Sequence, residues 1–354
     1  MVNHSNLYLH CTKLFFFDYI NSRVVQVVYE LLDARIYVVS MSVYKGDTKA
    51  DRTLVSIYNV TIAGVKRSLI TDWQYKSDIV IQLIWTVTNL VAYGFLGLSV
   101  GQGTGDFAPA YSFSLFLLSS SAFWTMFTGN YEETAFCLRE ECARGTMGYL
   151  ITNNVDTLGI MVGRYISSSL KFFVIFLVTT IPTFALVKSE TYGNLLPHSA
   201  SEFFLLVPLV LLSYLFMLGI SLFMGSITLL VKQTTTIVRI MLYLVRIVGG
   251  YFFMIESFSG MGAWWFPVVF VCLPIVSGQY AFRKYLIEHN TAARFPDIVM
   301  IEDYLGADLT FQGFTYGQII LINIGVCIVL LVAAYFFVRW MTKVARRRGT
   351  IEFY

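Results

Sequence analysis

A group of charged residues lies between positions 131 and 146, in a chain whose other segments are mostly apolar. It contains two pairs of adjacent acids, Glu132-Glu133 and Glu140-Glu141, followed by Arg144. We expect this segment to be helical and cytoplasmic. A short helix with an acidic face could dock into a groove on a soluble partner and transmit the partner's movement to the apolar helices on either side of it. A solvated connector would have the same residues, so this segment alone leaves both interpretations open.

Motifs that would indicate enzyme chemistry are absent from this sequence. Phosphate binding needs a Gly-rich loop ending in Gly-Lys-Ser or Gly-Lys-Thr, and the nearest candidate, Gly101-Gln-Gly-Thr-Gly105, lacks the lysine. No His-Glu-x-x-His or Gly-x-Ser-x-Gly motif occurs, so metalloprotease and serine hydrolase chemistry are unsupported. Glu302 and Asp303 are the most enzyme-like feature, since a membrane glycosyltransferase places paired acids at a metal-bound sugar donor. We expect no catalytic residue and no metal site.

The composition predicts a membrane protein. Of 354 residues, 56% are hydrophobic and 13% are charged, whereas soluble domains have about 25% charged residues. The apolar residues form long blocks instead of periodic stripes, and lipid is the solvent that suits such blocks. The formal net charge of +3 gives no reason to expect a nucleic-acid partner.

Six apolar blocks are long enough to supply the roughly 20 helical residues that cross a hydrocarbon core. They cover residues 79–100, 111–128, 160–187, 203–231, 237–258 and 316–341. A seventh apolar run, at 263–276, is short and contains Pro267 and Pro274, which favours a re-entrant or interfacial segment on the outer side. The sequence therefore predicts an all-α polytopic membrane domain over residues 78–348, with a re-entrant apolar hairpin before the last of six transmembrane helices.

The distribution of basic residues predicts the orientation, because Lys and Arg near helix ends accumulate on the cytoplasmic side. With six spans and both ends inside, the expected outer loops hold only Lys188, Arg283, Lys284 and Arg294. The inner segments hold many more, including the basic run at 346–348. We therefore expect a multi-pass protein of the cell membrane with both termini, and a short tail at 349–354, in the cytoplasm.

Residues 59–77 have the pattern of an amphipathic interface helix. Apolar residues recur there at steps of three and four, while Lys66, Arg67 and Lys76 lie elsewhere around the helix. Such a helix would lie on the inner leaflet, with Trp73 among the headgroups and the basic residues against anionic lipid. A solvated helix leading into the first span is the alternative. For residues 1–58 no structure is predicted.

Two cations fall within the expected spans, where an ionised group costs a few kcal/mol or more unless it is paired or hydrated. Arg246 lies seven residues after Arg239, so both share one face of the fifth span. Arg246 could face a subunit seam or an anionic group of a substrate. Alternatively, its stem could pack against a neighbouring helix while its charge snorkels. For Lys171 in the third span, snorkelling is the preferred interpretation.

The segment from Glu140 to Arg164 has a specific register. It holds Glu140, Glu141, Arg144, Gly145, Thr146, Met147, Leu150, Ile151, Val155, Ile160, Gly163 and Arg164. This register resembles, without a gap, that of the membrane subunits of ABC transporters of the type-2 exporter class. Two positions differ from the family pattern: Gly148 stands where an acid is usual, and Asn153-Asn154 replaces a Thr-Pro turn. The resemblance extends over about residues 59–348, including a proline-containing motif at Leu273-Pro274.

The resemblance implies a function and partners. The chain would be the permease subunit of an ATP-driven exporter of a lipidic, drug-like or polysaccharide substrate, without a cofactor of its own. ATP and Mg²⁺ would bind to a separate ATP-binding subunit, and a second permease copy or paralogue would complete a dimer. That subunit would contact the interface helix and the loop residues Glu140, Glu141, Arg144, Gly145, Thr146, Met147 and Leu150. The alternative is a secondary transporter or channel without an ATPase, which inverted repeats or broken spans with paired acids would favour.

Overall fold

We describe the fold from a computed structural model. It describes residues 49–102, 107–153, 155–186, 188–189, 193–194, 200–231, 234–252, 265–288, 294–295, 299–302, 308–311 and 313–348. The chain divides into two units, Met1–Asn59 and Val60–Tyr354, and the boundary falls within helix α2 (Lys49–Gln74). In the first unit, the described residues are the beginning of α2. Most of the expected N-terminal segment and the tail at 349–354 lie outside the described residues.

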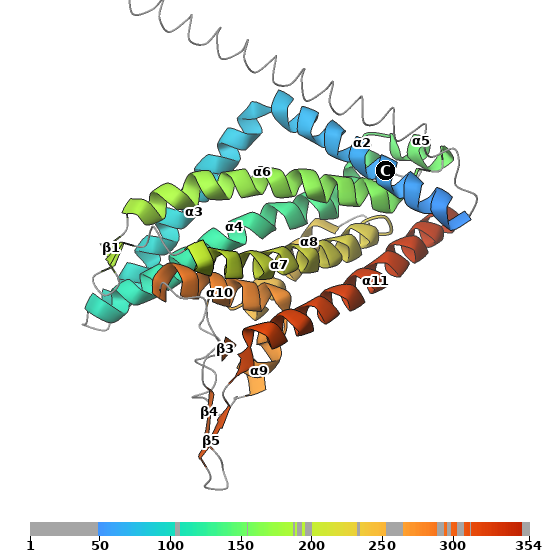
Figure 1. Cartoon of the computed structure of the whole chain (residues 1–354). Coiled ribbons are helices and arrows are strands. Elements are labelled where there is room, and N and C mark those ends of the chain that lie inside the picture. Colours follow the sequence, from blue (N-terminus) through green and yellow to red (C-terminus); the bar gives the residue numbers. More distant parts are fainter. Residues whose placement is uncertain are drawn as a thin grey trace, which may run out of the picture. The chain divides into compact units, whose positions relative to one another are not determined.

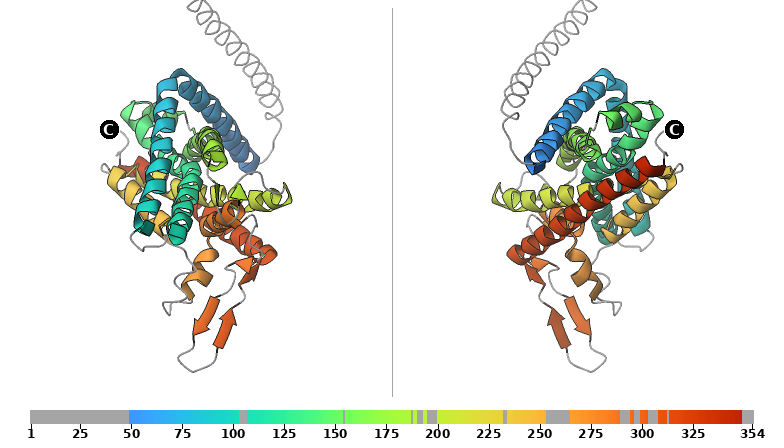
Figure 2. Two further views of the ribbon diagram at one scale, coloured as in Figure 1. Left: turned by 90° about the vertical axis from the view of Figure 1, so that its left-hand side faces the viewer. Right: turned by 90° about the vertical axis from the view of Figure 1, so that its right-hand side faces the viewer.

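The second unit is built mainly from α-helices (Figure 1, Figure 2). After α2 come α3 (Lys76–Gln102), α4 (Phe107–Ala143), α5 (Met147–Thr152), α6 (Thr157–Leu186), α7 (Ala200–Ile227), α8 (Thr234–Val248), α9 (Trp265–Val271), α10 (Pro274–Glu288) and α11 (Tyr316–Arg348). The predicted all-α polytopic membrane fold is confirmed.

Short antiparallel strand pairs, which were not predicted, accompany the helices. They are β1 (Lys188–Ser189) with β2 (Gly193–Asn194), β3 (Arg294–Phe295) with β6 (Phe314–Thr315), and β4 (Val299–Glu302) with β5 (Asp308–Phe311). The β4–β5 hairpin projects away from the helices (Figure 1). Of the two acids considered at the sequence level, Glu302 ends β4, and Asp303 lies outside the described residues.

Within the described ranges, four helices are long and apolar enough to cross a membrane, by length and composition. They are Lys76–Leu96 of α3, Thr157–Phe184 of α6, Phe203–Ile227 of α7 and Tyr316–Arg347 of α11, and each contains one of the expected spans or most of it. The expected spans at 111–128 and 237–258 correspond to α4 and α8, which do not meet the same condition. The described part of α8 has only 15 residues, and residues 253–258 lie outside the described part of the chain. The count of six spans therefore stays a prediction.

The predicted interruption before the last span is present. Taken together, α9 and α10 are long and apolar enough to form a fifth membrane-spanning segment, but they are bent by 99° at the short break between them. Pro274 begins α10, where its missing N–H and fixed φ suit the first turn of a helix. A bend of this size suits either a broken span or a re-entrant segment.

Helix α4 is central to the packing of the second unit. It contacts α3, α6, α7, α8 and α10, and its largest buried side chains include Trp124, Tyr131 and Phe127. Because other helices surround it, α4 can carry serines and threonines, which lower its mean hydropathy. A condition based on hydropathy therefore does not select α4 as a membrane-spanning helix. At 37 residues it is about 55 Å long, which exceeds the roughly 30 Å of a hydrocarbon core. We therefore infer that one end extends beyond the membrane.

Candidate functional site at the end of helix α4

From the sequence, we expected the charged segment at 131–146 to form a short helix of its own. In the structure it does not. Tyr131 to Ala143 are the last turns of α4, which runs without a break from the helix core into this segment. The short helix α5 follows only after a turn at Arg144, Gly145 and Thr146. The acidic residues are therefore rigidly connected to the centre of the fold, because an unbroken helix links them to it.

A glycine shapes this turn. The N–H of Gly145 donates to the carbonyl of Cys142 at 3.0 Å, and the N–H of Thr146 donates to the carbonyl of Glu141 at 3.0 Å. This pair of bonds is the Schellman motif, which requires a left-handed residue after the helix, and Gly145 has φ +72°. The geometry of this turn thus explains why a glycine stands at position 145, before Thr146.

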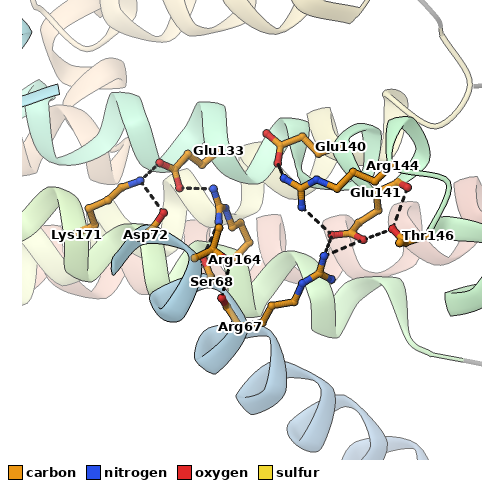
Figure 3. Close-up of polar contacts among 11 residues, drawn as sticks. Arg67, Ser68, Asp72, Glu133, Glu140, Glu141, Arg144, Thr146, Arg164 and Lys171 are labelled. Atoms are coloured by element: carbon orange, nitrogen blue, oxygen red, sulfur yellow. Dashed lines mark hydrogen bonds and ion pairs between the residues drawn. The ribbon is translucent and has the colours of Figure 1, made fainter. Parts of the chain in front are cut away.

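Glu141 is the centre of the polar contacts around the turn (Figure 3). Its side chain is buried, with the residue only 7% exposed. Arg67 of α2 approaches it at 3.0 Å, Arg144 lies 3.8 Å away, and the hydroxyl of Thr146 donates to it at 2.5 Å. A buried carboxylate is stable only when it is paired and hydrogen-bonded, and these three neighbours meet that need. We call Arg67, Glu141, Arg144 and Thr146 the turn cluster.

A second group, the charged cluster, consists of Ser68, Asp72, Glu133, Arg164 and Lys171, and it joins α2, α4 and α6 (Figure 3). Glu133 pairs with Arg164 at 3.1 Å and with Lys171. Lys171 also lies 3.6 Å from Asp72, and Arg164 donates to the hydroxyl of Ser68 at 2.6 Å. Two acids and two bases balance, which reduces the cost of burying them.

The charged cluster corrects the interpretation of Lys171. Snorkelling was preferred for this lysine, but its amino group is paired with Glu133 and Asp72, and its side chain is 9% exposed. Burial raises the pKa of the Glu133 carboxyl, while the charges of Arg164 and Lys171 oppose that shift. Sequence reasoning missed this cluster, although Arg164 and Lys171 are seven residues apart and so share one face of α6.

Two glycines allow α2 to approach α6 closely. A Cβ on Gly163 would lie 2.7 Å from the carbonyl oxygen of Thr61 and 3.2 Å from the Cα of Gly64. The hydroxyl of Thr61 donates to the carbonyl of Gly159 at 3.4 Å. The backbones therefore nearly touch at this crossing, and the side chains of the charged cluster extend the contact along both helices.

The remaining predicted loop residues differ in exposure. Glu140 is half-exposed and pairs with Arg144 at 3.4 Å, so both present charge near the surface of the turn. Met147 is buried at the start of α5, and Leu150 is half-buried. Gly148 is exposed, and a Cβ there would meet nothing within 4 Å. Contact of these residues with an ATP-binding subunit stays a prediction.

The interface-helix residues lie along the second half of α2. Arg67 belongs to the turn cluster, Lys66 is half-buried, and Trp73 is 47% exposed with the amino group of Lys76 5.1 Å from its ring. The helix begins earlier than expected, at Lys49, and ends at Gln74.

Arg239 and Arg246 are not brought to the turn. Both lie on α8, where Arg239 is exposed and Arg246 is half-buried. Arg246 donates to the hydroxyl of Thr128 on α4 at 2.7 Å, and its guanidinium lies 6.0 Å from the ring of Trp124 and 5.5 Å from that of Tyr251. This placement supports the alternative in which Arg246 packs against a neighbouring helix, and a role at a subunit seam stays a prediction.

These helices and paired buried charges define an integral membrane protein with a polar cluster beside its central helix. The sequence model of the family described as ABC-2 type transporter matches residues 59–287. This range is well over half of the chain, so the chain belongs to that family and is an ABC transporter permease. A comparison with curated proteins gave no match. Membership implies a transport subunit without catalytic activity that works with an ATP-binding subunit.

Proposed function

We propose that the chain couples ATP hydrolysis on a separate subunit to export, and that the turn after α4 receives the movement. One observation carries the proposal: the buried Glu141, at the end of a helix that runs unbroken into the core, binds Arg67 of α2 and Thr146, the turn residue that directly precedes α5. A displacement of the turn would therefore act on α4 and α2 together.

The contacts in the turn cluster suit a movable junction. Arg67 and Arg144 are each half-exposed, so water can replace either partner when the turn shifts. When one arginine is displaced, the other arginine and Thr146 stay beside the buried carboxylate, so the junction can rearrange without leaving Glu141 unpaired. The charged cluster is more buried and would hold α2 on α6 during the movement.

The proposal includes partners that complete the transporter. ATP and Mg²⁺ would bind to the partner subunit, and a second permease copy or paralogue would form the other half of a dimer. Both termini would be cytoplasmic, on the side of the turn cluster. Arg239, exposed on α8, is our candidate for the dimer seam. The substrate would be lipidic, drug-like or polysaccharide in nature.

The test is co-expression with a candidate ATP-binding subunit, with membrane retention of that subunit as the readout. Glu140→Lys reverses a half-exposed charge at the turn, and we expect retention to fall at least about fivefold, as for the loss of about 1 kcal/mol of binding free energy. Asp78→Lys, an exposed acid at the start of α3, is the matched control and should leave retention unchanged. Equal retention in the two variants would contradict the docking role of the turn.

A second variant separates binding from transmission. Glu141→Gln keeps the shape of the side chain but removes the charge that attracts Arg67 and Arg144. We expect the ATP-binding subunit to stay bound while stimulation of its ATPase rate by the permease is lost. Full stimulation with normal retention would mean that Glu141 does not transmit the movement. If the native chain retains no ATP-binding subunit at all, the ATP-independent transporter or channel becomes the better hypothesis.

A further inference from the structure

The lipid-facing side of α11 continues into a row of basic residues. Within the span, the strongly exposed residues of α11 are apolar, and they include Leu321, Val329, Val332 and Phe336. At 100° per residue, these positions lie on one side of the helix. The buried residues Ile319, Asn323, Cys327, Ala334 and Val338 lie on the other side, which faces α7.

The basic residues follow on the exposed side. Arg339, Lys343, Arg346 and Arg347 are all exposed, and their spacings of four, three and one place them within one third of the helix circumference. On the opposite side, Met341, Thr342 and Ala345 are buried. The apolar residues that would contact acyl chains and the basic residues that follow them therefore lie on the same side of α11.

The length of the helix places this change near the membrane surface. The stretch from Ile319 to Val338 has no charged residue and measures about 30 Å along the helix axis, which is the thickness of a hydrocarbon core. Trp340, 58% exposed, lies beside the first cation, as aromatic residues at a membrane interface do. The last turns of α11 would then cross the headgroup region.

Among the groups that the structure describes, an acid neutralises the first cation. Arg339 pairs with Asp156 at 3.4 Å and lies over the ring of Tyr335 at 4.7 Å. Asp156 also caps α6, where it accepts from the N–H of Leu158 at 3.0 Å, and Thr157 and Thr342 hydrogen-bond at 3.0 Å. Among the described residues, Lys343, Arg346 and Arg347 have no ion-pair partner. These contacts hold the end of α11 against the start of α6 and leave three cations available to an anion.

We propose that the exposed face formed by Lys343, Arg346 and Arg347 binds the headgroup of an anionic phospholipid whose acyl chains lie along the apolar face of α11. Charge complementarity selects the headgroup, and the continuity of the two faces selects a lipid over a soluble anion. This site is independent of the proposed coupling role and needs no ATP-binding subunit.

The test uses the full-length chain in nanodiscs of phosphatidylcholine with phosphatidylglycerol, and measures the enrichment of phosphatidylglycerol retained on extraction into detergent. The triple variant Lys343→Gln, Arg346→Gln and Arg347→Gln should lose this enrichment by roughly fivefold for each cation removed. The charge-preserving triple variant Lys343→Arg, Arg346→Lys and Arg347→Lys should keep it. All six substitutions are on the exposed face, so the fold should tolerate them.

Three outcomes would overturn the proposal. The first is unchanged enrichment in the glutamine variant. The second is loss of the retained lipid on addition of millimolar inorganic phosphate, which would show a site for a free anion. The third is loss of enrichment in the charge-preserving variant, which would show that the positive charge of this face does not select the lipid.

Discussion

Two polar clusters in the second unit differ in charge. The charged cluster holds α2, α4 and α6 together through ion pairs around Glu133 (Figure 3). The other, which we call the neutral cluster, is deeper along α4 and is centred on Gln279 of α10. Trp124 donates to the side-chain oxygen of Gln279 at 2.6 Å, and the Gln279 amide donates to Ser120 at 3.1 Å and to the carbonyl of Gly250 at 2.9 Å. Both clusters fix α4 to its neighbours.

The difference follows from what each environment tolerates. A charge within the bilayer is costly, while neutral hydrogen bonds between membrane helices contribute about 0.6 kcal/mol on average and up to about 1.7. The neutral cluster therefore uses an amide, an indole and a hydroxyl. The charged cluster lies toward the end of α4 that carries the turn, and there the pairing of two acids with two bases offsets the cost of the charges. We infer that both clusters hold α4 in place, the neutral cluster in the core and the charged cluster where α2 crosses α6.

Loss of one member of the charged cluster should have the largest effect. Glu133→Leu would leave Arg164 and Lys171 with Asp72 as the only acid, and we expect the free energy of unfolding to fall by about 3 kcal/mol or more. Glu140→Leu, seven residues further along the same helix, removes an acid that is half-exposed and should change it by no more than about 0.5 kcal/mol. Unfolding by denaturing detergent in bicelles measures both. Similar losses in the two variants would contradict the view that burial of the charges makes the cluster important.

An intermediate effect is expected in the neutral cluster. Gln279→Leu leaves the indole N–H of Trp124 and the carbonyl of Gly250 without their partner, which should cost about 2 kcal/mol. Replacing both partners, with Gln279→Leu and Trp124→Phe, removes one of the unsatisfied groups. The double variant should therefore be destabilised by less than the sum of the two single changes. Additive losses, measured in the same unfolding assay, would show that the two side chains do not act as a pair.

The sequence was sufficient to predict the helical membrane fold, because blocks of apolar residues report contact with lipid. It was less informative for α4, whose neighbours are other helices. There, Ser119, Ser120 and Ser121 are buried, so the hydropathy of α4 does not indicate whether the helix crosses the membrane. The sequence also did not show that the helix continues to Ala143, because Gly129, directly after the expected second span, does not end it.

For the candidate site, the register from Glu140 to Arg164 singled out Gly145 and Thr146, but it did not predict that the helix would end at Ala143 or that Gly145 would shape a turn there. It did not predict that Glu141 would be buried while Glu140 is half-exposed, because adjacent acids look alike in sequence. Nor did it predict the pairing of Lys171, whose partners are 38 and 99 positions away along the chain. Such contacts depend on how α2 crosses α6, and that crossing depends on the close approach at Gly64 and Gly163.

The smallest expected effect distinguishes the turn cluster from the neutral cluster by its dependence on salt. Arg67→Gln removes a half-exposed partner of Glu141 and should lower the free energy of unfolding by about 1 kcal/mol or less. Raising the salt concentration from about 0.1 M to about 1 M shortens the Debye length from about 10 Å to about 3 Å, so the difference between Arg67→Gln and the native chain should shrink. The effect of Gln279→Leu should stay constant, because no formal charge is involved. If both effects respond to salt alike, the turn cluster is not held by exposed electrostatics, and its proposed ability to rearrange loses its physical basis.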